Sequence, residues 1–213
     1  MPLSLKIDFT KDIELAVWKI TEDVCYFSNK IQFHNDEKSI IERLSKRKLI
    51  EWLSSRYLLH IMSGRSIRGA FTKDIHGKPS LENSDFHISI SHSQDQVAVI
   101  ASEKLVGVDI QHYVEKIYRI KEKFVSENEF VDIPKEKELP ALHIIWGAKE
   151  SLYKAYGKRS LDFKKNIGIS ELDITQDSGK FRGWVNKDDY FKEFEIYYTL
   201  YKKYVLVYAK EYS

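Results

Sequence analysis

The sequence predicts an α+β fold of two pseudo-symmetric halves, each a long helix packed on a mainly antiparallel sheet. Two strongly periodic helices stand about one hundred residues apart, and several short strand patterns follow each of them. The chain has 213 residues, which is long enough for two such halves. The connection at residues 101–107 is short and strand-like, so the halves, residues 1–105 and 106–213, should share a close interface.

In the first half, residues 11–25 carry apolar side chains among charged ones and predict one or two short strands. The clearest helix follows, with Asn35 and Asp36 as its N-cap and Gly64 at its end. Residues 67–73 predict a further strand. The apolar positions of the helix are Ile40, Ile41, Leu44, Ile50, Leu53 and Tyr57.

A meander of three strands is predicted next, at residues 86–91, 97–101 and 105–111. The third strand contains three small or polar residues at alternate positions. The period of two places Gly107, Asp109 and Gln111 on the face opposite Val108 and Ile110.

The second half begins with a charge-rich segment that predicts a helix and a turn at residues 113–130, followed by a solvated connector at 132–139. A second strong helix spans residues 140–157, with Pro140 at its first position and Gly157 at its C-terminus. Four strand patterns complete the chain, at residues 167–174, 180–185, 194–200 and 204–209.

The composition describes a globular protein without a strong preference for charged partners. Lys and Arg exceed Asp and Glu by only two charges, so we expect neither a nucleic acid nor a membrane as partner. The single cysteine, Cys25, excludes an internal disulfide and the usual structural zinc sites. Without a signal peptide or a spanning segment in the sequence, we expect a cytoplasmic protein.

One strand and one helix carry the residues that predict a metal site. Asp109 lies in a strand that otherwise reads as buried, so it needs a cation or hydrogen bonds beside it, unless it only caps the next element. Glu150 and Lys154 lie on one stripe of the second helix, where they could also be an ordinary surface pair. Carboxylates from a strand and a helix would suit Mg²⁺, which recruits phosphates. The stripe is His143, Gly147, Glu150, Lys154 and Gly157.

Basic residues are placed where they could meet a phosphate from several sides: Arg47, Lys78, His92, and Lys149 or Lys154. The turn at Lys78 lacks the first Gly and the final Ser or Thr of a Walker A loop. The Ser-His-Ser run at residues 91–93 lacks the Gly-x-Ser-x-Gly elbow, which argues against a serine hydrolase.

Five short blocks, taken in order, resemble the signature of the 4′-phosphopantetheinyl transferase superfamily. The chain length resembles the surfactin-synthetase-activating (Sfp-like) subclass, in which one chain carries two halves, rather than the half-sized holo-acyl-carrier-protein synthases. The blocks are Gly77-Lys78-Pro79, Ile88-Ser89-Ile90-Ser91-His92-Ser93, Gly107-Val108-Asp109-Ile110, Phe124-Val125-Ser126-Glu127-Asn128-Glu129 and Trp146-Gly147-Ala148-Lys149-Glu150-Ser151-Leu152-Tyr153-Lys154.

The resemblance implies Mg²⁺-dependent transfer of the phosphopantetheine arm of coenzyme A to a serine of an apo acyl or peptidyl carrier protein. By matched position, it implies that Asp109 and Glu150 bind the metal, that Glu150 also serves as a base, and that Lys154 stabilises the leaving group. It further implies that Arg47, Lys78 and His92 hold phosphates, with Ser91 beside them. We expect the enzyme to be a monomer. Glu129 matches an acidic family position whose role the sequence does not give.

Gln111 departs from the family pattern, because many relatives have a Glu at this position. The period of two still places the amide beside Asp109, where its carbonyl could bind the metal weakly or hold a water. Two alternatives remain open: a different Mg²⁺-dependent phosphoryl or nucleotidyl transferase, and a noncatalytic relative that binds coenzyme A or a carrier protein.

Overall fold

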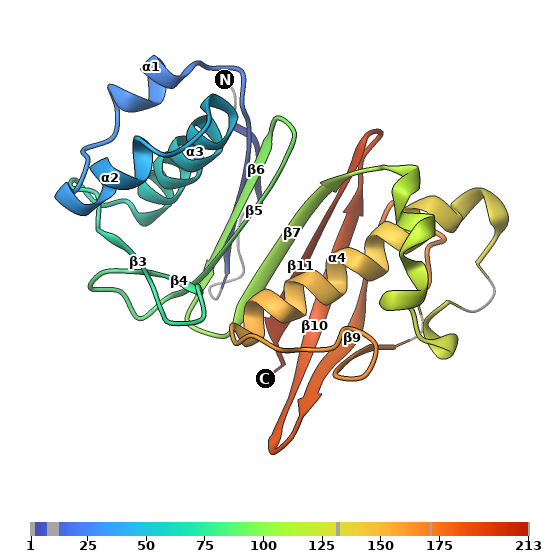
Figure 1. Cartoon of the computed structure of the whole chain (residues 1–213). Helices are drawn as coiled ribbons and strands as arrows, with labels where there is room; N and C mark the ends of the chain where they lie inside the picture. The colour runs from blue at the N-terminus through green and yellow to red at the C-terminus, as the bar shows by residue number, and fades with distance from the viewer. Residues whose placement is uncertain (1–2, 8–12, 131–132, 171, 213) are drawn as a thin grey trace.

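The computed structural model describes residues 3–7, 13–130, 133–170 and 172–212 and has the predicted α+β architecture. Figure 1 shows two antiparallel sheets side by side, each with one long helix against it. None of the helices in the described residues has the length and apolar character needed to cross a membrane.

The first sheet has the strand order β1-β2-β6-β5, and a separate hairpin of β3 and β4 lies beside it. The long helix α3 packs on this sheet through buried residues such as Leu53 and Leu58. The elements of this half are β1 (Leu3–Ile7), β2 (Glu14–Lys19), α1 (Val24–Ser28), η1 (Asn35–Glu37), α2 (Lys38–Ile41), α3 (Lys46–Ser63), β3 (Phe71–Lys73), β4 (Pro79–Leu81), β5 (His87–Ser93) and β6 (Gln96–Ser102).

The second sheet has the strand order β7-β11-β10-β9-β8, and helix α4 crosses one of its faces. Buried residues of α4 such as Leu142 and Leu152 form the core of this half. Its elements are β7 (Val106–His112), η2 (Glu115–Arg119), η3 (Lys121–Lys123), η4 (Glu127–Glu129), η5 (Lys135–Lys137), α4 (Glu138–Tyr156), β8 (Ile167–Ile169), β9 (Ser178–Lys187), β10 (Tyr190–Leu200) and β11 (Tyr204–Glu211).

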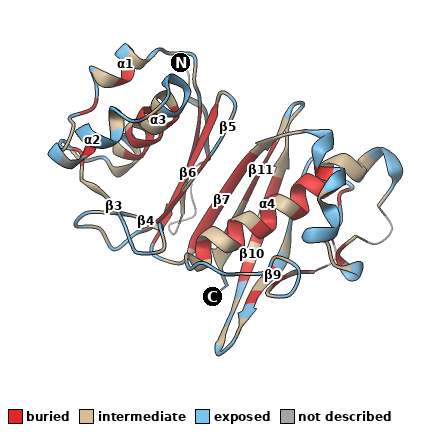
Figure 2. Cartoon of the chain, in the orientation of Figure 1, coloured by how far each residue is buried: buried red, intermediate tan, exposed pale blue. Residues whose placement is uncertain are grey.

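A third apolar cluster joins the two sheets. Val108 and Ile110 of β7 pack against Leu15 and Ile100 of the first sheet. Figure 2 shows long buried stretches on β6 and β7, with exposed residues gathered at the outer loops and helix ends. The two halves therefore share a core, as the short connection between them predicts.

The prediction of one long helix that begins after residues 35–36 and ends at Gly64 is wrong. The segment forms η1, α2 and α3 instead. Glu37 is buried in an ion pair with Arg68, with Arg56 also close, and this anchors η1. The chain then turns, and Ser45 caps the new helix α3 by accepting a hydrogen bond from the backbone N–H of Lys48. A cap at residue 45 overrides the predicted cap at residues 35–36.

Four other predictions need correction. Cys25 lies in the short helix α1 rather than in a strand, and residues 11–12 lie outside the described residues. The segment at residues 113–130 forms three short 3₁₀ helices instead of one helix and a turn. Helix α4 begins at Glu138, two residues before Pro140, whereas Gly157 ends it in the left-handed region as predicted. The four final strands are present, with β8 ending earlier, at Ile169.

Candidate active site

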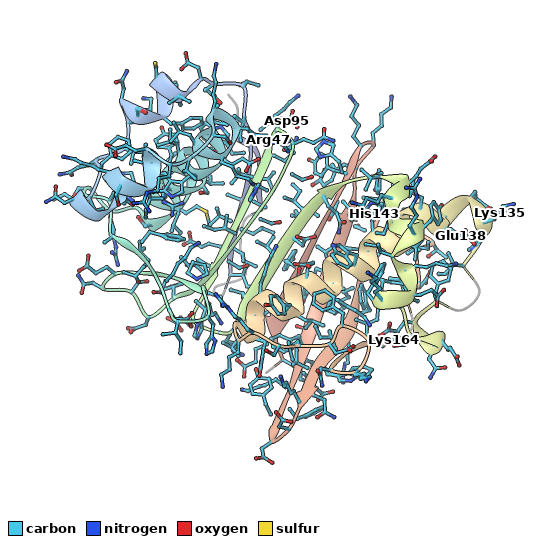
Figure 3. All side chains as sticks on the ribbon, viewed as in Figure 1. Arg47, Asp95, Lys135, Glu138, His143 and Lys164 are labelled. Carbon is cyan, nitrogen blue, oxygen red and sulfur yellow. The ribbon has the colours of Figure 1, made fainter. Side chains whose placement is uncertain are left out.

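The strand β7 presents its polar residues to helix α4, as the period of two predicts. Asp109 contacts Lys154 of α4, and Gln111 donates a hydrogen bond to the backbone carbonyl of His143 in α4. Val108 and Ile110 point to the other face, into the core between the sheets. Figure 3 marks His143 on α4, on the helix stripe that the sequence singled out.

Two glycines allow α4 to lie close to the second sheet. A Cβ on Gly107 would stand 1.9 Å from the carbonyl oxygen of Ser151 in α4. A Cβ on Gly147 would stand 2.8 Å from Cγ2 of Val207 in β11. The helix can therefore approach β7 only while these positions lack a side chain, and this approach brings Lys154 to Asp109.

We expect Gly107→Ala to destabilise the protein by about 1 to 3 kcal/mol, since the added methyl must displace the backbone of α4. Gly69→Ala is the matched control, because its Cβ would meet chiefly the flexible end of Arg65 at 2.8 Å. Urea unfolding of both variants measures the difference. Equal stability of Gly107→Ala and the wild type would show that α4 is not held against β7 in this way.

Asp109 is almost fully buried and accepts three side-chain hydrogen bonds. Its Oδ1 accepts from Lys154 Nζ at 2.9 Å and from Ser91 Oγ at 2.9 Å. Its Oδ2 accepts from Gln111 Nε2 at 3.0 Å. The positive group that a buried carboxylate needs is therefore Lys154, and Ser91 lies beside the carboxylate itself.

Glu150 faces the same region but lacks a partner. Within the described part of the chain, its carboxylate makes no hydrogen bond and no ion pair. Burial raises the pKa of Glu150; the charge of Lys154 opposes this, and the negative charge of Asp109 adds to it. An unpartnered, half-buried carboxylate close to a second carboxylate favours a bound cation.

The residues present fit a hard cation with oxygen ligands. Asp109 and Glu150 supply carboxylates. Gln111 donates both of its side-chain hydrogen bonds through Nε2, so its Oε1 can bind a cation. No group of three His, Cys, Asp or Glu side chains suited to a metal occurs among the described residues. This agrees with a neutral residue at position 111.

Two of the three predicted phosphate-binding residues meet around one carboxylate. Arg47 Nε lies 3.2 Å and His92 Nε2 lies 2.9 Å from the carboxylate oxygens of Glu51, which is 5% exposed. Lys48 Nζ donates to the same carboxylate at 2.9 Å and lies 3.3 Å from His92. Sequence reasoning missed Lys48 and Glu51, although Glu51 lies three residues after Lys48 and four after Arg47, and these spacings were a usable signal.

Arg47 and Lys48 outnumber the acid between them, whereas burial lowers the pKa of His92. Burial alone would raise the pKa of Glu51, but the hydrogen bond from Lys48, the charge of His92 and the bond from Arg47 lower it below its usual value. Figure 3 shows Arg47 near Asp95, and both line an open cavity between the tips of the β5–β6 and β10–β11 hairpins. Excess positive charge beside a cavity attracts an anion.

Lys78 does not join this cluster. Its Nζ donates to the carbonyl of Ala155 at 2.7 Å, at the C-terminal end of α4, where a cation is favoured. Lys78 and Lys154 line a common cavity of about 120 Å³ between the halves, together with Gly77 and Tyr153. The predicted cations thus lie at two places along the interface between the halves, which we call the seam: Lys78 at the end of α4, and Arg47 and His92 around Glu51.

Lys149 and Glu129 form a buried pair away from Asp109. Lys149 Nζ lies 2.8 Å from Glu129 Oε2, and the lysine side chain is 0% exposed. Glu129 also accepts hydrogen bonds from the backbone N–H groups of Ser126 and Ile169. Of the two lysines considered for a phosphate, only Lys154 lies at the seam, and Glu129 anchors the η4 turn to α4 and β8.

Comparisons with known proteins find relatives for the second half of the chain. Residues 105–209 match a family model described as the 4′-phosphopantetheinyl transferase superfamily. The chain is 35% identical over 91 residues to the 4′-phosphopantetheinyl transferase gsp of Aneurinibacillus migulanus, covering 41% of this chain and 38% of that protein. It is 32% identical over 92 residues to the 4′-phosphopantetheinyl transferases psf-1 of Bacillus pumilus and ffp of Bacillus subtilis, covering 41% of this chain and 40% and 41% of those proteins. The matched region spans about two fifths of each relative's length.

Proposed function

Residues 105–209 place the chain in the 4′-phosphopantetheinyl transferase superfamily, and on this premise we propose that it modifies carrier proteins. In the proposed reaction, the 4′-phosphopantetheine arm of coenzyme A moves to a serine of an apo acyl or peptidyl carrier protein, and adenosine 3′,5′-bisphosphate leaves. The observation that carries this proposal is the meeting of Asp109, Glu150 and Lys154 beside the cavity that Lys78 and Lys154 line.

Asp109, Glu150 and the carbonyl of Gln111 would hold a Mg²⁺ ion in this proposal. When bound, the ion would supply positive charge to the pyrophosphate of coenzyme A. The support is the unpartnered carboxylate of Glu150 next to that of Asp109.

Glu150 is the proposed base. Its carboxylate makes no hydrogen bond and no ion pair among the described residues, which leaves it free to accept a proton. The carboxylate takes the proton of the carrier serine, the serine oxygen bonds to the phosphorus that bears the pantetheine arm, and the bridging P–O bond breaks. Lys154 Nζ stabilises the leaving phosphate, and Lys78, Arg47, Lys48 and His92 hold the remaining phosphate charge.

The test is incubation of the protein with coenzyme A, Mg²⁺ and a panel of apo carrier proteins, followed by intact-mass measurement. We expect a mass gain of one phosphopantetheine arm on at least one carrier. Coenzyme A binding without any mass gain would instead support a noncatalytic relative. Turnover of a nucleotide without a carrier would support a different phosphoryl or nucleotidyl transferase.

Arg47→Ala and Lys48→Ala should each weaken coenzyme A binding by about 1.5 to 3 kcal/mol, which is typical for a hydrogen bond to a charged group. Lys46→Ala is the matched control, because this exposed lysine lies at the start of the same helix. Titration calorimetry with coenzyme A measures each affinity. An equal loss in Lys46→Ala would indicate a general charge effect instead of a phosphate site.

We propose that the two halves are residues 1–105 and 106–213, because β6 of the first sheet ends at Ser102 and β7 of the second sheet begins at Val106. The proposed site draws residues from both halves. One chain contributes all of these residues, which supports a monomeric enzyme. The single cysteine supports a reducing, cytoplasmic location.

A further inference from the structure

Serine hydroxyls join the two sheets at the seam between β5 and β7. The backbone N–H groups of Val108 and Ile110 donate to Ser89 Oγ at 3.1 Å and to Ser91 Oγ at 3.2 Å. The next rung repeats the arrangement at 3.1 Å, with His112 N–H donating to Ser93 Oγ. In every rung the two residues are 19 positions apart, so the two strands run parallel in fixed register.

The hydroxyls replace the carbonyl groups that would join neighbouring strands of one sheet. Among the described residues, no backbone hydrogen bond connects β5 to β7, and the two strands belong to different sheets. The serines therefore hold the strand edges apart by the length of a side chain. We call these three serine-to-amide bonds the serine ladder.

The middle rung differs from the other two because it also contacts Asp109. Ser91 Oγ accepts from Ile110 N–H and donates to Asp109 Oδ1 at 2.9 Å. Both Ser91 and Asp109 are buried, so few waters can replace these bonds. Asp109 is thus held from the first half by Ser91 and from the second half by Lys154.

We propose that Ser91 is a positioning residue: as the middle rung of the serine ladder, it fixes the direction of the Asp109 carboxylate and the distance between the halves. This inference rests on the proposed function for its catalytic consequence. Residues from the two halves act on one substrate only if the seam is held in register. Ser91 supplies this register at the carboxylate that is proposed to bind the metal.

Ser91→Ala tests the proposal, with Ser93→Ala as the matched control that removes a rung without touching Asp109. We expect Ser91→Ala to raise the Mg²⁺ concentration for half-maximal transfer about tenfold, as the loss of a charge-assisted hydrogen bond predicts. The KM for the carrier protein should stay unchanged. Ser93→Ala should keep the Mg²⁺ dependence of the wild type.

Amide hydrogen exchange measured by NMR gives a second readout that does not depend on transfer. The Ile110 amide should exchange faster in Ser91→Ala, and the His112 amide should do so in Ser93→Ala. If Ser91→Ala does not fold, Ser91→Cys keeps the shape and weakens the hydrogen bonds, and the same measurements apply. A wild-type Mg²⁺ dependence in the folded Ser91 variant, or an equal shift in Ser93→Ala, would overturn the proposal. A wild-type protein that lacks transfer but shows the expected exchange pattern would instead refute the proposed function alone.

Discussion

Asp109→Asn is expected to slow phosphopantetheine transfer by about 100- to 1,000-fold, the range for loss of one preorganised electrostatic contact in an active site. The asparagine keeps the size of the side chain and an oxygen for the bonds from Ser91 and Lys154. It removes the negative charge that the proposed Mg²⁺ needs. Intact-mass time courses at saturating coenzyme A measure the rate, and near-normal turnover at limiting Mg²⁺ would place the metal elsewhere.

The stabilities of the Asp109 and Glu150 variants should change in opposite directions. Asp109→Asn breaks an ion pair with Lys154, which is 24% exposed, so the loss should be about 1 to 2 kcal/mol, below that of a fully buried pair. Glu150→Gln removes a carboxylate that has no partner among the described residues, so it should raise the melting temperature in the absence of metal.

The sign of the Glu150 effect depends on pH. Its pKa is raised on folding, mainly by burial, so the charged form destabilises the folded state above that pKa. Below the ordinary value of 4.5, the carboxyl group is protonated in both states and the penalty disappears. The advantage of Glu150→Gln should therefore be present at pH 7 and absent near pH 4 in melting experiments with a chelator. A lower melting temperature at pH 7 would show that Glu150 has a stabilising partner.

Local patterns were sufficient to predict how the side chains of the candidate site lie relative to one another. The alternation in β7 placed Asp109 and Gln111 on one face, and the stripe in α4 placed Glu150 and Lys154 opposite them. Both patterns follow from the geometry of a single element. Gly107 next to Asp109 belongs to the same pattern, because the strand must approach α4 closely.

The features that could not be predicted depend on contacts between distant segments. The split before α3 arises because Glu37 pairs with Arg68, a residue 31 positions away. Spacing along α3 could indicate that Glu51 pairs with Arg47 and Lys48, but it gives no sign that His92 of β5 joins the same carboxylate. No periodicity within one element indicates such partners.

Lys149 and Lys154 lie on one helix, and the sequence alone could not tell which of them binds a phosphate. The partners that separate them, Glu129 and Asp109, come from other segments. Lys149→Met should destabilise the protein by about 3 to 5 kcal/mol, since it leaves the carboxylate of Glu129 buried without its cation. Urea unfolding measures this loss. Lys154→Met should cost less stability, because Lys154 is partly exposed, but it should remove most of the transfer activity.

Adding Glu129→Gln to Lys149→Met provides the decisive comparison for this pair. The neutral amide no longer leaves a buried charge unpaired, so the double variant should regain part of the lost stability. Its transfer rate should also recover, because neither Glu129 nor Lys149 lies at the seam. If Lys149→Met folds with wild-type stability and loses transfer, Lys149 acts on the substrate instead. In that case the buried pair would have to open during the reaction, and Lys149 would take the role assigned to Lys154.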